Sequence, residues 1–160
     1  MKRSIYFSRL AGICGSLLLL LACAVFAQDR TPGRSPSHQV AIHVDDNDAK
    51  VMNLALNNAK NVLDYYQSKG ETITIEIVTY GPGLHMLRAD TSPVKQRIAE
   101  MSLAAPEISF AACNNTQVNM SRQEGKEVVL VSEARVVPSG VVRLIELQEK
   151  GYSYIRPSGR

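Results

Sequence analysis

Cysteine is scarce in this chain, whose 160 residues include three: Cys14, Cys23 and Cys113. The first two lie in an N-terminal segment typical of an export signal, so the mature chain keeps only Cys113. One cysteine excludes a disulfide framework within a subunit and cannot build a structural zinc site. Cys113 is therefore either a small buried apolar side chain or a thiol that the protein uses.

The chain also lacks a comfortable membrane span. Residues 10–22 are apolar and follow residues 1–9, which carry basic and no acidic side chains. This run is shorter than the roughly 20 residues of a spanning helix and suits a secretory signal. We predict a signal peptide over residues 1–27, cleaved near Ala27, and a periplasmic or secreted protein. The alternative is a lipoprotein processed at Cys23, the one case in which we expect a membrane partner.

No excess of charge remains once the signal is removed. The whole chain has 18 Lys+Arg and 15 Asp+Glu, and the signal holds three of the basic residues. The mature chain therefore carries 15 residues of each sign. Because neither a net positive charge nor a basic stripe with interleaved aromatics is present, we expect no nucleic-acid partner.

Patterns typical of metal and cofactor sites are missing as well. His38, His43 and His85 show no paired ligand spacing. The segment Gly81-Pro82-Gly83 matches neither a phosphate-binding loop nor a dinucleotide fingerprint and indicates a turn. The acidic residues at 45–48 lack the later glutamate of a calcium hand and indicate helix caps. We expect neither a metal nor a cofactor.

Apolar periodicity predicts one α/β domain over residues 38–157, after a disordered lead-in over residues 28–37. We expect strands over residues 39–45, 72–80, 108–113, 127–132 and 152–156. We expect helices over residues 49–69, 93–104, 116–123 and 139–150, with a shorter one at 84–90. In the last long helix, Val141, Leu144, Ile145 and Gln148 share the expected apolar face. Strands that alternate with helices and are almost continuously apolar indicate a parallel sheet covered on both faces.

Parallel sheets of this kind place their sites at the carboxyl ends of the strands. Asp45, Tyr80, Gly81 and Cys113 would meet at that edge. Cys113 closes an apolar strand and is followed at once by a polar helix start, where backbone N–H groups lower a thiol pKa. The alternative is a buried, inert cysteine.

Two histidines are candidates for the same edge. His43 lies on the first strand, in phase with Asp45, and could transfer protons near neutral pH. His85 follows the predicted turn at residues 81–83. The alternative for both is a hydrogen-bonded histidine of structural use, and the sequence leaves open whether His43 reaches Cys113.

Several segments together resemble one known family. They are His43–Asp46, Leu56–Asn61, Glu76–Leu84, Phe110–Thr116, Val137–Leu144 and Gly151-Tyr152. Their order and spacing, over nearly all of residues 38–157, resemble the DsrE/DsrF-like family, also called YchN-like. The resemblance implies a three-layer α/β/α sandwich with a five-stranded parallel sheet, and homo-oligomers that are often trimers or hexamers. In members of this family a cysteine after the third strand carries persulfide sulfur between partner proteins, and Cys113 falls at that position.

The resemblance therefore implies an exported sulfur carrier or sulfurtransferase-like protein with a thiol-bearing partner protein. Cys113 would carry the persulfide, Asn114 and Thr116 would stabilise the thiolate, and His43, Tyr80 and Gly81 would be neighbours. Because the sulfur carriers of the family are cytoplasmic, two alternatives stay open. One is a non-enzymatic oligomeric module that binds a small ligand or partner near Gly81 and Cys113. The other is a redox sensor that forms an intersubunit disulfide.

Overall fold

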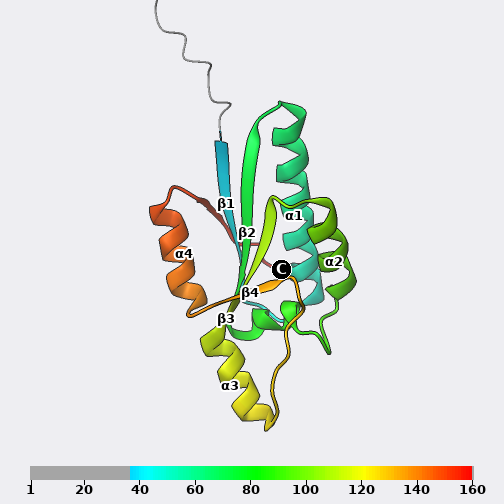
Figure 1. Cartoon of the computed structure of the whole chain (residues 1–160), viewed down its shortest axis with the longest axis vertical. Helices are drawn as coiled ribbons and strands as arrows, with labels where there is room; N and C mark the ends of the chain where they lie inside the picture. The colour runs from blue at the N-terminus through cyan, green and yellow to red at the C-terminus, as the bar shows by residue number, and fades with distance from the viewer. Residues whose placement is uncertain (1–36, 160) are drawn as a thin grey trace, which may run out of the picture. The chain divides into compact units, whose positions relative to one another are not determined.

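Five parallel strands form one sheet in the structure, a computed structural model that describes residues 37–159 (Figure 1). The strand order is β4-β3-β2-β1-β5, and every neighbouring pair is parallel. The α/β fold with a parallel sheet is confirmed. The predicted signal peptide, Cys23 and the lead-in up to residue 36 lie outside the described residues.

Strands and helices alternate along the chain. The strands are β1 (Ser37–Val44), β2 (Thr72–Thr79), β3 (Ile108–Cys113), β4 (Ala134–Val137) and β5 (Ser153–Ile155). The helices are α1 (Ala49–Ser68), α2 (Lys95–Ala104), α3 (Asn114–Glu124) and α4 (Gly140–Glu149), with a 3-10 helix, η1, at Gly81–Leu87. None of the helices within residues 37–159 is long and apolar enough to span a bilayer.

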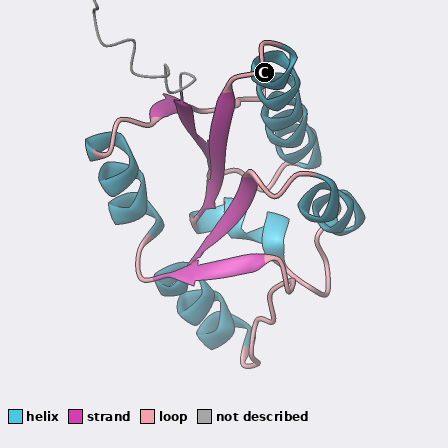
Figure 2. Cartoon of the chain, turned by 45° about the horizontal axis from the view of Figure 1, so that its top comes forward, coloured by secondary structure: helices cyan, strands magenta, loops and turns pink. Residues whose placement is uncertain are grey.

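The sheet has two unequal apolar faces. On one face α1 and α2 cover a large core that includes Ile42, Leu56, Ile77, Ile98 and Phe110. On the other face α4 covers a small cluster of Ala41, Val78, Ala111, Val137, Leu144 and Leu147. Figure 2 shows α4 across the sheet from α1 and α2. The layers form the three-layer α/β sandwich.

The α4 face of the sheet is also the polar face. Successive side chains of a strand alternate between faces, so His43 follows Ala41, and Glu76 precedes Val78, on the α4 side. By the same alternation Cys113, two residues after Ala111, lies on that side. His43 and Glu76 are both buried there. The chemistry-bearing residues thus gather under the thinner of the two helical layers.

The fourth strand was predicted in the wrong place. Residues 127–132 do not join the sheet, and β4 at residues 134–137 occupies the edge beside β3. The apolar run instead pairs antiparallel with the chain after η1, where Ala89 N–H donates to Val129 O at 2.9 Å and Val131 N–H donates to Leu87 O at 2.9 Å. These hydrogen bonds give the run backbone partners outside the sheet.

Three further differences concern element ends and faces. β1 begins at Ser37, inside the predicted lead-in. The segment at residues 81–83 is the start of η1 rather than a separate turn, and η1 ends at Leu87 instead of residue 90. In α4 the buried residues are Gly140, Leu144 and Leu147, while Val141 and Ile145 are about half-exposed at 50% and 51%. The prediction for that face is therefore confirmed for Leu144 and wrong for Val141, Ile145 and Gln148.

Candidate functional site

Cys113 is the last residue of β3 and occupies the N-cap position of α3. No loop separates the strand from the helix, because α3 begins at Asn114 rather than at the predicted residue 116. Cys113 is a free cysteine and only 4% exposed. The predicted placement of the thiol, at the end of a buried strand and the start of a helix, is confirmed.

Hydrogen bonds set the acidity of this thiol. Burial raises the pKa of Cys113, but hydrogen bonds from the Thr116 side chain and from the backbone N–H groups of Gly140, Thr116 and Asn115 lower it. The hydrogen bonds outweigh burial, so the pKa lies below its ordinary value. A thiol in such surroundings has the character of a nucleophile.

These donors come from the starts of two helices. Asn115 and Thr116 lie in the first turn of α3, whereas Gly140 is the first residue of α4. Ser139 caps α4 by accepting a hydrogen bond from Val142 N–H at 3.4 Å. Each helix start carries a partial positive charge, and both favour the anionic form of the sulfur.

Gly140 is needed for this approach. A Cβ at position 140 would lie 2.9 Å from Cβ and Cδ1 of Tyr80 and 3.3 Å from Cβ of Cys113. Gly140 was not among the site residues predicted from the sequence. Its available signal was a glycine placed directly after the helix-capping Ser139, where a better helix former would ordinarily stand.

Gly81 reaches the thiol through Thr116. The N–H of Gly81 donates to Thr116 Oγ1 at 2.9 Å, which leaves the hydroxyl hydrogen available for the Cys113 sulfur. The structure thus brings two predicted site residues together, with Thr116 at the thiol and Gly81 behind it. The Asn114 side chain is exposed and makes no hydrogen bond within the described residues. The backbone N–H of Thr116 serves the thiol from this stretch, and that of Asn115, which also acts on the thiol, donates to Pro138 O at 3.4 Å.

An aromatic stack extends the site away from the thiol. The rings of His43 and Tyr80 stack at 4.6 Å between centroids, and Tyr80 also borders Gly140. His43 Nδ1 is hydrogen-bonded to the hydroxyl of Tyr154 at 2.7 Å. Tyr80 therefore lies between His43 and the Gly140–Cys113 contact. Tyr154 was missed by the sequence analysis, because only the pairing of β5 with β1 brings it here.

His43 is neutral in this setting. Burial lowers its pKa, Asp45 raises it and Arg156 lowers it, with a net lowering. Its Nε2 is buried and has no hydrogen-bond partner among the described residues, since Asp45 Oδ2 lies 3.7 Å away. Arg156 pairs with Asp45, with Nη2 to Oδ2 at 2.8 Å. The unpartnered nitrogen gives His43 capacity for one more hydrogen bond.

Tyr80 keeps its proton. Burial and the nearby Asp45, Tyr154 and Cys113 raise its pKa, and Arg156 only partly opposes them. The phenol is therefore a hydrogen-bond donor at neutral pH rather than a base.

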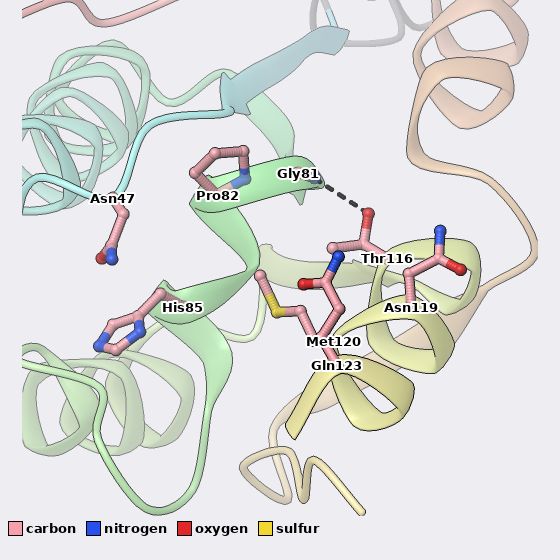
Figure 3. Close-up of a pocket in the computed structure, with 8 residues that line it drawn as sticks. All are labelled: Asn47, Gly81, Pro82, His85, Thr116, Asn119, Met120 and Gln123. Atoms are coloured by element: carbon pink, nitrogen blue, oxygen red, sulfur yellow. Dashed lines mark hydrogen bonds between the residues drawn. The ribbon is translucent and has the colours of Figure 1, made fainter. Parts of the chain in front are cut away.

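A cavity of about 440 Å³ opens between η1 and α3, beside the thiol (Figure 3). It is lined by Asn47, Gly81, Pro82, His85, Thr116, Asn119, Met120 and Gln123. Cys113 is not among these residues, but Thr116 lines the cavity and contacts the sulfur. His85 belongs to this cavity and bonds through Nε2 to Thr91 O at 3.0 Å, so it does not reach the thiol directly.

Nothing in the described part of the chain gathers metal ligands. Within residues 37–159 no group of three or more His, Cys, Asp or Glu side chains is arranged to hold an ion. The site is therefore described by its thiol, its hydrogen-bond donors and its aromatic stack.

Comparisons with known proteins find similarity to a solved structure. No protein-family model matches the chain, and no curated protein matches it. A similar solved structure is that of MTH1491 from Methanobacterium thermoautotrophicum, described as a protein of unknown function, with 31% sequence identity and a TM-score of 0.63. The match covers 75% of this chain and 99% of MTH1491. At this identity and coverage, the chain belongs to the same protein family as MTH1491.

Proposed function

We propose that this protein is an exported sulfur carrier of the DsrE/DsrF-like kind, in which Cys113 holds sulfane sulfur as a persulfide. The observation that carries the proposal is the position of Cys113 at the N-cap of α3 and against Gly140 at the start of α4, where two helix N-termini favour the thiolate and lower its pKa. A buried structural cysteine needs no such donors.

The reaction is an exchange of sulfur between thiols. The Cys113 thiolate attacks the outer sulfur of a donor persulfide, R–S–SH. The donor S–S bond breaks, a new S–S bond forms at Cys113, and the donor leaves as a thiol with the proton. An acceptor thiolate on a partner protein then attacks the outer sulfur and releases the Cys113 thiolate. Neither step needs an oxidant or a reductant.

The neighbouring residues have separate tasks in this scheme. The N–H groups of Gly140 and Thr116 stabilise the negative sulfur before and after transfer. Thr116 adds its hydroxyl and links the thiol to the cavity. Tyr80, with its proton retained, supplies a donor beside the site, and His43 fixes the Tyr80 ring by stacking.

The cavity between η1 and α3 favours a second candidate, a non-enzymatic binding module. Its volume suits a small ligand, and none of its lining side chains carries a formal charge when His85 is neutral. In this candidate Cys113 is a packed side chain and the cavity is the site.

A redox sensor is less compatible with the position of the thiol. A disulfide requires two Cα atoms within about 7 Å of each other. Cys113 lies beneath α4 and is 4% exposed. Two subunits could therefore join their thiols only after α4 had moved.

For assembly we propose a homo-oligomer, a trimer or hexamer as the resemblance implies. Half-exposed apolar side chains support this proposal: Val136 on the edge strand β4, and Val141, Val142 and Ile145 on α4. Light scattering after size-exclusion chromatography would test it, and a monomer at micromolar concentration would contradict it. Export is proposed from the predicted signal peptide, and the mass of the secreted protein would distinguish cleavage at Ala27 from lipidation at Cys23.

The function is tested on the mature protein, residues 28–160. We expect the alkylation rate of Cys113 to titrate below the ordinary thiol value of about 8.5. After exposure to a low-molecular-weight persulfide, we expect the intact mass to rise by one sulfur atom, and Cys113→Ser to abolish the gain. A thiol that takes up no sulfur would exclude the carrier and leave the binding module. A stable intersubunit disulfide would favour the sensor.

A further inference from the structure

A buried carboxylate lies in the middle of the sheet on the α4 face. Glu76 belongs to the central strand β2 and is 4% exposed. Arg143 of α4 grips it with two hydrogen bonds, Nε to Oε1 and Nη2 to Oε2, both 2.7 Å. Arg135 of β4 adds a third, Nη2 to Oε1 at 3.0 Å. Arg143 is mostly buried and Arg135 is half-exposed, and none of the three side chains belongs to the thiol site.

Stability alone does not explain this arrangement. Desolvating a charged pair costs several kcal/mol, and replacing buried pairs with apolar residues is often neutral or stabilising. The α4 face is otherwise apolar around Val78 and Ala111, so an aliphatic side chain would suit it. A paired carboxylate and guanidinium add geometric specificity, because the two parallel hydrogen bonds fix the relative orientation of the two side chains.

The two arginines lie on either side of the segment that presents Gly140. Arg135 precedes it on β4 and Arg143 follows it in the first turn of α4, so one carboxylate holds both ends. The backbone N–H of Arg143 also donates to Ser139 O at 2.9 Å, which closes that turn. Any shift of Arg143 therefore moves the start of α4, where Gly140 donates its N–H to the thiol.

We infer that Glu76 is a positioning residue, which holds Arg135 and Arg143 so that the N–H of Gly140 stays against the sulfur of Cys113. The inference rests on the proposed function for its use in sulfur transfer. The positioning of Gly140 by Glu76 affects the thiol itself and can be tested without any sulfur transfer. The rival explanation is that Glu76 merely attaches α4 to the sheet.

For a neutral replacement of Glu76, electrostatics and positioning predict opposite changes in the acidity of the Cys113 thiol. Glu76→Gln removes a negative charge and leaves two cations, which by charge alone would make the Cys113 thiol more acidic. Loss of the Gly140 donor would make it less acidic. The other groups that bear on the thiol are Tyr80, at the N-cap of η1, and the donors of α3, with His43, Asp45 and Arg156 beyond Tyr80. None of them bonds to Glu76.

The experiment compares full mature variants by the rate of iodoacetamide alkylation across pH. The readout is the midpoint of the rate–pH curve. Alkylation through an opened state is recognised separately, by a midpoint at the ordinary thiol value of about 8.5 and a rate that rises with added urea. We expect Glu76→Gln and Arg143→Lys to raise the midpoint by about half to one pH unit, equivalent to three- to tenfold less thiolate at low pH. The matched control is Glu146→Gln, which removes the exposed partner of Arg143 on the same helix.

A midpoint that is unchanged or lower in Glu76→Gln and Arg143→Lys would overturn the inference. If the other variants fail to fold, Arg135→Gln provides the test. We expect this variant to fold, because Arg135 is half-exposed and the Glu76–Arg143 pair remains. It is expected to shift the midpoint less, in the same direction, and no shift would count against the inference. If the wild type takes up no sulfur while the variants still shift, the proposed function fails and the positioning role stands.

Discussion

Gly140 and Cys113 lie so close that a methyl group on Gly140 would come within 3.3 Å of Cβ of Cys113. This contact joins the first residue of α4 to the last residue of β3. It places a backbone donor on the sulfur and leaves no room for a side chain. The acidity of the thiol and the identity of residue 140 are therefore linked.

Gly140→Ala is expected to impair both packing and thiol chemistry. The added carbon would lie 2.9 Å from two Tyr80 atoms, and overpacking of this kind costs about 1–3 kcal/mol. We also expect a higher pKa for Cys113, because α4 must move away. Urea unfolding and the alkylation profile would measure the two effects. Val141→Ala, on the exposed side of the same turn, serves as control, and equal results for both variants would contradict the prediction.

Thr116→Val tests the hydroxyl that connects Gly81 to the thiol. Valine keeps the shape but offers neither the acceptor for Gly81 N–H nor the donor for Cys113. We expect a raised Cys113 pKa and a stability loss of about 1 kcal/mol. Thr116→Ser should restore the thiol profile. If valine and serine variants titrate alike, the hydroxyl has no part in setting the acidity.

The lowered pKa of His43 predicts that the free energy of unfolding changes on the acid side of neutrality. Burial lowers its pKa in the folded protein, so the unfolded chain binds a proton first as the pH falls. Its contribution is complete above the unfolded value of about 6.5 and is lost as the pH falls through the lower folded value. We expect the free energy of unfolding to decrease below about pH 6.5, and His43→Asn to flatten this decrease. His85→Asn is the control. If the free energy of unfolding of His43→Asn depends on pH as steeply as that of the wild type, His43 is not the cause of the decrease.

The ion pairs of Arg88 predict a second change in the free energy of unfolding, at lower pH. It bonds to Asp90 with Nη2 to Oδ2 at 2.8 Å and also to Glu124, at the end of α3. These hydrogen bonds hold the pKa values of both carboxyl groups below their ordinary range. Stability from the pairs is present above about pH 4 and is lost as the pH falls further. Arg88→Met should weaken this acid dependence, measured by urea unfolding from pH 5 to 3.

Lys126→Gln is the matched control for Arg88. Its ammonium lies 3.7 Å from Asp90 and 3.9 Å from Glu124 and is largely exposed. A surface pair at such distances contributes little. An acid profile that changes as much in the lysine variant as in the arginine variant would contradict the role given to Arg88.

The sequence predicted those elements whose local signals agree with one another. Helix α1 has an Asp48 cap that accepts from Lys50 N–H at 2.7 Å, a regular apolar face and Gly70 after its end with φ of 69°. β3 and the thiol position were equally readable, because an apolar strand ends abruptly in a polar helix. At such places tertiary packing has little left to decide.

The errors arose where tertiary contacts overrule local pattern. The valine-rich run at residues 127–132 has high strand propensity, yet it pairs with the chain after η1, while Ala134–Val137 takes the sheet edge. Tyr154 had no signal as a site residue and Gly140 only a weak one, because they approach His43 and Cys113 through the β5–β1 pairing and the packing of α4. A single sequence does not show which distant segments will become neighbours.

The thin apolar cluster beneath α4 has a consequence for access to the thiol. Few large side chains hold this helix, in contrast with the core beneath α1 and α2. Segments with little buried apolar area open first in the native state. We expect amide hydrogens of α4 to exchange faster than those of α1, and Glu76→Gln to accelerate exchange in α4 alone. Helix α4, which covers Cys113, would then also be the element that opens to admit the second sulfur atom.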